Sequence, residues 1–360
     1  MDITTLIPEP QEAGNEWADR CQYWRQIADQ RPDKRKRRQR ETRPLILAGH
    51  GISISVHRST LLIQDGNTHY PGTKRTTRYF KGDLTIPPRI VLVDGSGNIS
   101  LDALDWMGEQ KIDLIRLKWD GRIISVASAS GYSADPKKLA WQLSTRQSAS
   151  KRMTFAVGQI TEKIKQTLFN LENLLPPSHS REKAIETAKG ALKELKNKSP
   201  QSIGKLLAIE GAVAAGYFFA WRALSINWKS TGRHPVPDEW KRYFSRSSLK
   251  HLKTPHNSSA THPINSMLNY AYGILESRMR IQTIAEGYDP SVGIMHDRIN
   301  PDRHSFVFDL MEPDRPIVDR TVLKLIKQES FTGSDFILRQ DGICRLNPQL
   351  ARSLAQSLSQ

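Results

Sequence analysis

Hydrophobic and polar residues alternate along much of the segment from residue 44 to residue 128. This two-residue period is typical of half-buried β-strands. It is seen in ILAGHGISISVH (46–57), TLLIQDGNTHY (60–70) and RIVLVDGSGNISL (89–101), and again at 113–119 and 122–128. Turn signals at Asp65-Gly66, at 94–97 and at Asp120-Gly121 are expected to separate the strands, and residues 101–110 to form a short helix. We therefore expect a compact β-rich domain over residues 46–130.

Beyond Gly131 the hydrophobic period changes to that of amphipathic helices. Apolar residues recur three and four positions apart in segments 135–170, 181–197, 201–226, 263–286 and 317–329. Pro176-Pro177, Ser199-Pro200 and the proline-rich stretch 232–263 interrupt the pattern. The sequence thus predicts an α+β multidomain chain, in which the small β-rich domain precedes a larger all-α domain over residues 131–360.

Residues 1–45 differ from both domains. Trp17, Cys21, Trp24 and Ile27 have helical spacing, which predicts a short amphipathic helix. A basic run follows, and blocks of like charge usually stay solvated and disordered. Its members are Arg31, Lys34, Arg35, Lys36, Arg37, Arg38, Arg40 and Arg43. Two interpretations stay open for this partly disordered extension: a solvated tail, or an arm that lies along DNA phosphates without reading sequence.

The net charge of the chain indicates which class of partner it binds. The chain has 53 Lys and Arg against 37 Asp and Glu, a net charge of +16, which favours binding to a polyanion such as nucleic acid. Two cysteines, Cys21 and Cys344, provide neither a disulfide framework nor a zinc spacing. We see no apolar run near the roughly 18 residues that span a bilayer, and no signal peptide. A cytoplasmic protein without a membrane partner is expected.

The segment 202–224 carries the first candidate for chemistry. On a helix, Glu210 lies three and four residues from Leu206 and Val213, in the middle of an apolar face. A carboxylate there must be protonated, paired or bound to metal, because an unpaired buried charge is costly. The alternative is a purely structural role, in which Glu210 pairs with an Arg or caps a neighbouring helix. A second face, made of Gly204, Ala208, Gly211 and Ala215, is expected to let another helix approach closely.

Two further candidates follow the helix expected at 263–286. His296 ends the loop GYDPSVGIMHD and, by itself, has the pattern of an ordinary polar histidine. Asp309 and Glu312 are three residues apart, which fits either a capping box or two carboxylates on one side of a site. Pro313 weakens the capping interpretation, because it lacks the N–H for the first full helical turn. Carboxylates with one histidine and no thiolates suit Mg²⁺ or Mn²⁺.

In this order, these motifs resemble the CRISPR-associated adaptation endonuclease/integrase family, which inserts new spacers into CRISPR arrays. The similar stretches are LLAIEGAVAAGYF (206–218), PINSMLNYAYGILESRM (263–279) with GYDPSVGIMHD (287–297), FVFDLMEPDRPIVDR (306–320) and FTGSDFILRQDGICRLNP (331–348). GHGISISVHRSTLLIQDG (49–66) and IVLVDGSGNISLDALDWM (90–107) extend the resemblance to the β half. It implies that Glu210, His296 and Glu312 hold the metal and that Asp309 supports the site; the segment before Pro44 has no counterpart.

The resemblance also implies an activity and partners. It implies antiviral adaptation by metal-dependent transesterification, in which a DNA 3′-hydroxyl attacks a phosphodiester of the repeat; His296 acts as a ligand or, alternatively, through a proton. It further implies double-stranded and branched DNA substrates, a homodimer formed through the β-rich domain, and a small partner protein. Alternatives are a transposon-type integrase, a stand-alone nuclease and, from another class, a non-catalytic DNA-binding scaffold.

The proline-rich segment after the Glu210 helix combines basic and aromatic residues. We expect these residues either to contact DNA, through phosphates and base stacking, or to form a solvated basic loop whose aromatic side chains belong to the core. The basic residues are Lys229, Arg233, Lys241, Arg242, Arg246, Lys250 and Lys253, and the aromatic ones are Trp228, Trp240 and Tyr243.

Overall fold

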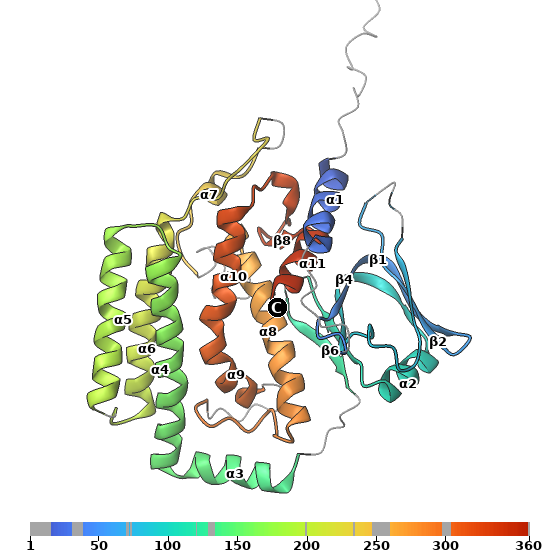
Figure 1. Ribbon diagram of the computed structural model, residues 1–360. Coiled ribbons are helices and arrows are strands. Elements are labelled where there is room, and N and C mark those ends of the chain that lie inside the picture. The colour runs from blue at the N-terminus through green and yellow to red at the C-terminus, as the bar shows by residue number, and fades with distance from the viewer. Residues whose placement is uncertain are drawn as a thin grey trace, which may run out of the picture.

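A computed structural model describes residues 16–30, 39–69, 72, 74–119, 121–128, 134–198, 200–232, 235–246, 260–296 and 304–358. A six-stranded sheet occupies the first part of the chain and helices dominate the remainder, as Figure 1 shows. The predicted α+β class and the order of its two parts are confirmed.

The sheet is mixed, with strand order β3-β2-β1-β4-β5-β6. Its strands are β1 (Leu45–His57), β2 (Thr60–Gln64), β3 (Thr76–Tyr79), β4 (Arg89–Ile99), β5 (Asp113–Leu117) and β6 (Ile123–Ala127). β4 runs parallel to β1 and β5, and the other pairs are antiparallel. The parallel step from β4 to β5 is made by the predicted short helix, α2 (Leu101–Glu109), because parallel neighbours need a crossover connection.

The turn signal Asp65-Gly66 directly follows the end of β2, and a further turn at Arg58 and Ser59, which both adopt positive φ, joins β1 to β2. The break expected at 94–97 was wrong, because β4 continues through this stretch beside β1 with register shifts. Asp65 also joins distant segments, because its buried carboxylate accepts the Ala48 N–H at 3.1 Å and pairs with Arg352 at 2.5 Å.

The helices follow the predicted periodicity closely. They are α3 (Pro136–Gln147), α4 (Ala149–Asn173), α5 (His179–Asn197), α6 (Ile203–Ala220), the short α7 (Asp238–Lys241), α8 (Pro263–Ala285), α9 (Ser305–Met311), α10 (Arg315–Gln328) and α11 (Pro348–Ser357). The segment expected as one helix over 135–170 is divided at Ser148, whose side chain caps α4. The second part is not purely helical, because β7 (Phe336–Leu338) and β8 (Cys344–Leu346) form a small antiparallel hairpin.

The two faces of the large sheet belong to two separate buried clusters. One sheet face, with Ile46 and Val91, belongs to the same buried cluster as α4, α6, α8 and α10. The other face, with Ile54 and Leu61, packs with Trp106 of α2 in a second cluster. α8 lies between the sheet and α10, so the helix that precedes the His296 loop is fixed from both sides.

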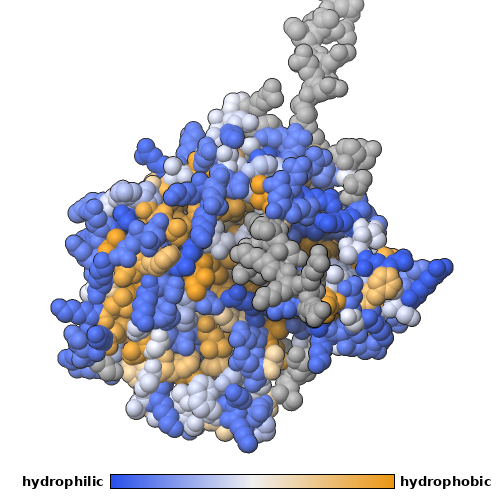
Figure 2. Space-filling model, viewed as in Figure 1, coloured by the Kyte–Doolittle hydropathy of each residue, from blue (hydrophilic) through white to orange (hydrophobic). Residues whose placement is uncertain are grey.

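Helix α6 packs against α4 and α5 and is apolar over most of its length. Contrary to expectation, its small-residue face does not hold another helix, since Gly204, Ala208, Gly211 and Ala215 are exposed. Residues 203–223 are also long and apolar enough to cross a membrane, which differs from the sequence-based expectation, although one such helix is weak evidence. Figure 2 shows apolar surface on the side of the molecule where α4, α5 and α6 lie.

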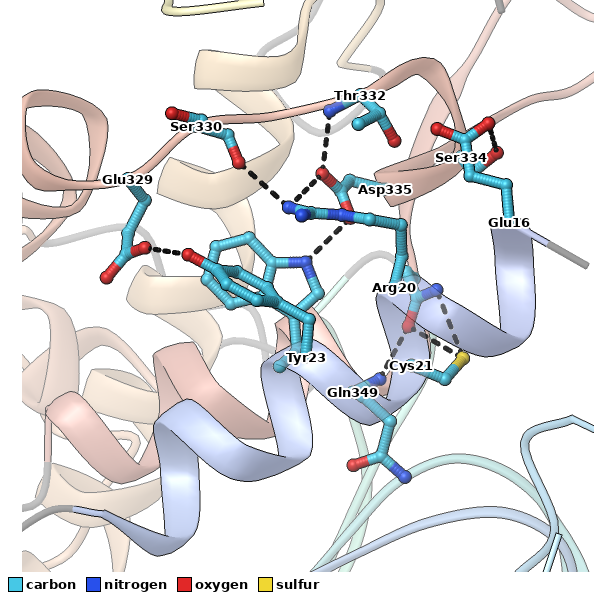
Figure 3. Close-up of polar contacts among 12 residues, drawn as sticks. Glu16, Arg20, Cys21, Tyr23, Glu329, Ser330, Thr332, Ser334, Asp335 and Gln349 are labelled. Carbon is cyan, nitrogen blue, oxygen red and sulfur yellow. Dashed lines mark hydrogen bonds and ion pairs between the residues drawn. The ribbon is translucent and has the colours of Figure 1, made fainter. Parts of the chain in front are cut away.

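The segment before Pro44 is not separate from the fold. The predicted amphipathic helix is present as α1 (Glu16–Asp29), and it packs along α11. Figure 3 shows its polar contacts: Arg20 donates two 2.8 Å bonds to Asp335, and Tyr23 donates to Glu329. Trp24 is fully buried. Residues 31–38 lie outside the described residues, so the predicted basic arm is not tested.

Helix α1 also reaches the β-rich domain. The Trp17 indole N–H donates to the Thr68 carbonyl at 2.7 Å, and the Gln349 amide on α11 donates to the Thr68 hydroxyl at 3.2 Å. The helix therefore contacts the loop after β2 and the C-terminal elements at the same time, and fixes one against the other.

Candidate metal and DNA site

Glu210 and Glu312 come together although 102 positions separate them. Glu210 lies midway along α6, and Glu312 opens the 3-10 turn η2 (Glu312–Asp314) that follows α9. Both carboxylates accept from one ammonium group, that of Lys163 on α4; the bond to Glu312 measures 2.6 Å. The three side chains are 16%, 18% and 10% exposed for Lys163, Glu210 and Glu312. Glu210 is thus a paired carboxylate on a mostly buried helix face. Its partner is a lysine, whereas the structural alternative considered above expected an arginine.

The charge of Glu312 is strongly favoured. Burial acts to raise its pKa, but the nearby positive charges of Arg315 and Lys163 outweigh it and lower the pKa to about 2. The Arg315 Nε donates to the other Glu312 oxygen at 3.1 Å. Both oxygens of Glu312 therefore face cationic groups, and the carboxylate stays ionised under physiological conditions.

His296 is oriented by Asp309 and lies near this carboxylate pair. The fully buried Asp309 carboxylate accepts the backbone N–H groups of Ile294, Met295 and His296 at 2.6, 2.9 and 3.1 Å. It also bonds His296 Nδ1 at 2.6 Å, which leaves Nε2 as the nitrogen with which the ring can act. The positive form of His296 is close enough to help lower the pKa of Glu312. The imidazole itself is 29% exposed.

This arrangement excludes the capping interpretation of Asp309 and Glu312. Asp309 lies inside α9 and not at its first position, and its oxygens are used by the 294–296 loop. The loop is held from its other side by Arg152 of α4, whose guanidinium donates to the Ile294 and Met295 carbonyls at 2.8 and 3.1 Å. Asp309 is thus a residue that positions the His296 loop.

An open pocket of about 160 Å³ lies beside the two carboxylates. Lys163, Arg246 and Arg315 give its lining three cationic side chains, so the pocket offers positive charge next to Glu210 and Glu312. Its floor contains Asp319, fully buried, whose carboxylate accepts from the Tyr272 hydroxyl at 2.5 Å. Burial raises the pKa of Asp319 to about 6. The lining therefore holds three basic and three acidic side chains, the latter being Glu210, Glu312 and Asp319.

The donor set fits a divalent cation, although no such centre is already assembled. Among the residues that the structure describes, no group of three His, Cys, Asp and Glu side chains could hold a metal ion. Glu210 and Glu312 nevertheless converge on one positively charged atom, and His296 has its Nδ1 tied to a carboxylate in the manner of metal-ligating histidines. Oxygen ligands with one imidazole suit Mg²⁺ or Mn²⁺.

The sequence analysis did not identify the cationic side chains of Lys163 and Arg315, or Asp319 beneath the pocket. Arg315 lies three residues after Glu312, so this spacing alone could have indicated it. Lys163 interrupts the buried face of α4 between Ile160 and Thr167, and this is the signal that singled out Glu210 on α6. Nothing in the local sequence of Asp319 indicated that it would be buried beneath the pocket.

In the basic and aromatic segment after α6, the aromatic side chains belong to the core, which was one of the two alternatives expected for them. Trp240 and Tyr243 are buried, at 3% and 2% exposure, and Trp228 stacks on Trp240 with ring centroids 6.2 Å apart. The Trp240 and Tyr243 rings are therefore not available as stacking groups for bases, and Trp228 is partly buried against the same core. Arg246 lines the pocket, while Arg233, Lys250 and Lys253 lie outside the described residues.

A comparison with protein families decides the relationship that the motifs suggested. The model of the CRISPR associated protein Cas1 family matches residues 45–360. The chain belongs to this family. The match confirms the resemblance and begins where β1 begins, so α1 precedes the part of the chain that the family shares.

Curated relatives agree with this assignment. The chain is 29% identical to the CRISPR-associated endonuclease Cas1 1 of Methanospirillum hungatei over 54% of this chain and 51% of that protein. It is 27% identical to the CRISPR-associated endonuclease Cas1 1 of Archaeoglobus fulgidus over 74% of this chain and 76% of that protein. The matched part thus spans about half of the first relative and about three quarters of the second.

Solved structures share the fold. A casposase bound to integration product superposes with a TM-score of 0.70 at 24% identity, over 88% of this chain and 82% of that one. A Cas6-RT-Cas1–Cas2 complex gives 0.64 at 18% identity, over 91% of this chain and 33% of that one. At these identities the likeness concerns the fold alone.

Proposed function

We propose that this protein is a metal-dependent DNA endonuclease and integrase of CRISPR adaptation, with Glu210, His296 and Glu312 as its metal ligands. The observation that carries this proposal is that the carboxylates of Glu210 and Glu312 both bond the Lys163 ammonium, at the edge of a pocket that Arg246 and Arg315 also line. Membership of the Cas1 family, whose curated relatives are named endonucleases, supports the type of reaction.

The bound metal would supply Lewis acidity at a phosphodiester and favour attack by a DNA 3′-hydroxyl or by water. The protein's own residues do the remaining work. Asp309 bonds His296 Nδ1 and so fixes the ring. The other ring nitrogen, Nε2, is then the atom that would act as a metal ligand or carry a proton. Arg315 and Arg246 place positive charge in the pocket, where negative charge develops on the phosphoryl oxygens of the transition state.

DNA is the expected substrate, in double-stranded and branched form, and a protein partner is expected to act with the chain. The net charge of +16 favours a polyanion, and the similar solved structures include a casposase with its integration product and a complex that contains Cas2. Assembly as a homodimer through the β-rich domain, a small partner protein and action in the cytoplasm remain proposals from the family resemblance.

The experiment is strand transfer of a labelled DNA end into a supercoiled plasmid that carries a CRISPR repeat, with Mg²⁺ or Mn²⁺ and then with chelator. We expect Glu210→Ala, His296→Ala and Glu312→Ala each to lower strand transfer by on the order of 100-fold or more, with DNA binding retained. The matched control is Glu172→Ala on the exposed part of α4. Integration at wild-type rates by all three variants would show that the site is wrong.

The same assay separates the alternatives. Insertion without preference for the repeat plasmid would favour a transposon-type integrase. Cleavage without joining would favour a stand-alone nuclease. DNA binding with neither reaction, at any metal concentration, would favour a non-catalytic scaffold.

A further inference from the structure

Lys163 has an unusual position for a residue outside the predicted metal ligands. Its ammonium is the one group that bonds both Glu210 and Glu312 among the contacts described, and it does so from a third element, α4. The side chain is only 16% exposed, so the ion pairs are shielded from solvent. Exposed ion pairs contribute little, whereas removing one partner of a buried pair is strongly destabilising, because it leaves the other charge uncompensated.

The two carboxylates need such a counter-ion when no metal is present. Two ionised carboxylates that share one site repel each other, and without compensation one of them takes up a proton. Lys163 instead bonds both carboxylates, and the Arg315 Nε donates to Glu312 as well. The ammonium therefore occupies the place between the carboxylates that a bridging cation would occupy.

We propose that Lys163 is a built-in counter-ion of the metal-free site and that a divalent metal binds by displacing it from Glu210 and Glu312. This inference rests on the proposed function, because it takes those two carboxylates as ligands. Lys163 is then a positioning residue: it keeps α4, α6 and η2 together before metal arrives.

The displacement has a thermodynamic signature that a permanent ion pair lacks. When a group of the protein competes with a ligand for its site, the ligand binds only those molecules in which the site is free. Its apparent affinity is then reduced in proportion to that fraction. Removing the competitor raises that affinity. It also lowers the stability of the metal-free protein, because the carboxylates lose their counter-ion, but it leaves the stability of the metal-bound protein almost unchanged.

The test compares wild type with Lys163→Met, with Mn²⁺ alone as the probe. Mn²⁺ affinity is measured by calorimetry and by the electron paramagnetic resonance signal of the free ion. The melting temperature of each protein is measured with and without Mn²⁺. We expect Lys163→Met to bind Mn²⁺ on the order of tenfold more tightly. We expect its melting temperature to be lower than that of wild type without metal and equal to it at saturating Mn²⁺.

Three controls define the result. Lys165→Met removes an exposed lysine of the same helix, which pairs with the neighbouring Glu162 at 3.3 Å, and should change neither quantity. Lys163→Arg keeps a counter-ion and should remain near wild-type affinity. Arg315→Met removes a positive charge beside Glu312 without touching Glu210, and thus measures how much of the gain is general electrostatics.

The outcomes separate this inference from the proposed function. Unchanged or weaker Mn²⁺ affinity in Lys163→Met, or an equal loss of stability with and without metal, overturns the displacement. A gain in affinity no larger than that of Arg315→Met overturns it as well. Undiminished Mn²⁺ binding by Glu210→Ala and Glu312→Ala would instead show that the metal site itself is wrong.

Discussion

Single residues of the site owe their properties to partners from other elements. Glu210 could be suspected from α6 alone, because it interrupts an apolar face, but the group that pairs with it belongs to α4. His296 looked ordinary in the sequence, and its orientation depends on a buried carboxylate 13 positions later. Residue type and spacing thus indicated where charge is buried, and only the tertiary structure supplies what balances it.

A histidine remote from the site allows a prediction for pH. His262 caps α8, where its Nδ1 accepts the Ile264 N–H at 3.1 Å. Burial lowers its pKa from 6.5 to about 4, so the unfolded chain binds a proton more readily than the folded one. Stability from this group is complete above pH 6.5 and is lost as the pH falls toward 4.

His262→Asn keeps a capping oxygen and removes the titration. We expect wild type to lose about 2 kcal/mol more than this variant when the pH falls from about 7 to about 4.5. Urea unfolding at a series of pH values measures the difference. His57→Asn, at an exposed strand end, is the control, and a variant whose pH profile parallels wild type would contradict the prediction.

At the level of elements, periodicity was sufficient for most helices and insufficient for one of the turns. Apolar residues three and four positions apart predicted α5, α8 and α10 nearly to their ends, because packing of one apolar face requires that period. The stretch 94–97 looked like a break between strands, yet β4 continues through it beside β1. Asp65 does follow the end of β2, but the local sequence does not reveal its long-range partner Arg352.

Helix α1 shows how much one element adds to the rest. The Asp335 carboxylate is fully buried, and burial raises its pKa despite the bonds it accepts from Arg20. Trp24 donates to the same carboxylate at 2.7 Å. Removing the guanidinium would leave a buried charge without its cationic partner, which costs much more than the pair itself contributes.

We therefore expect Arg20→Met to lower the free energy of unfolding by about 3 kcal/mol. Chemical denaturation measures this loss, and Arg20→Met combined with Asp335→Asn should recover part of it. Arg75→Met, which breaks the exposed pair with Asp29 at 3.1 Å, should cost less than about 1 kcal/mol. Equal effects of Arg20→Met and Arg75→Met would show that α1 is only loosely attached.

At the level of the whole molecule, the sequence predicted the two parts of the chain but not how they are joined. Alternating strands and long helices are local patterns, and they indicated a β-rich part followed by a helical part. The docking of α1 on α11 and the burial of one sheet face against helices both depend on contacts between segments far apart. Such contacts leave no period in the sequence.

One of these junctions is a contact between two glycines. Gly273 lies within α8, and Gly121 lies in the turn between β5 and β6 with φ of 84°. A Cβ at Gly273 would lie 1.7 Å from the Gly121 carbonyl oxygen and 2.6 Å from its carbonyl carbon. The atoms that block it are backbone, so no side chain can move aside to make room.

Gly273→Ala should therefore push the β5–β6 turn away from α8 and lower the free energy of unfolding by about 1–3 kcal/mol, although alanine favours the helix. Gly190→Ala on α5, where a Cβ meets nothing within 4 Å, should instead stabilise the protein by up to about 1 kcal/mol. Denaturant unfolding of both variants measures the contrast. Because α8 leads into the loop of His296, we expect strand transfer by Gly273→Ala to fall as well, with Gly190→Ala unchanged. Stabilisation by both substitutions would mean that the sheet and α8 do not meet at this point.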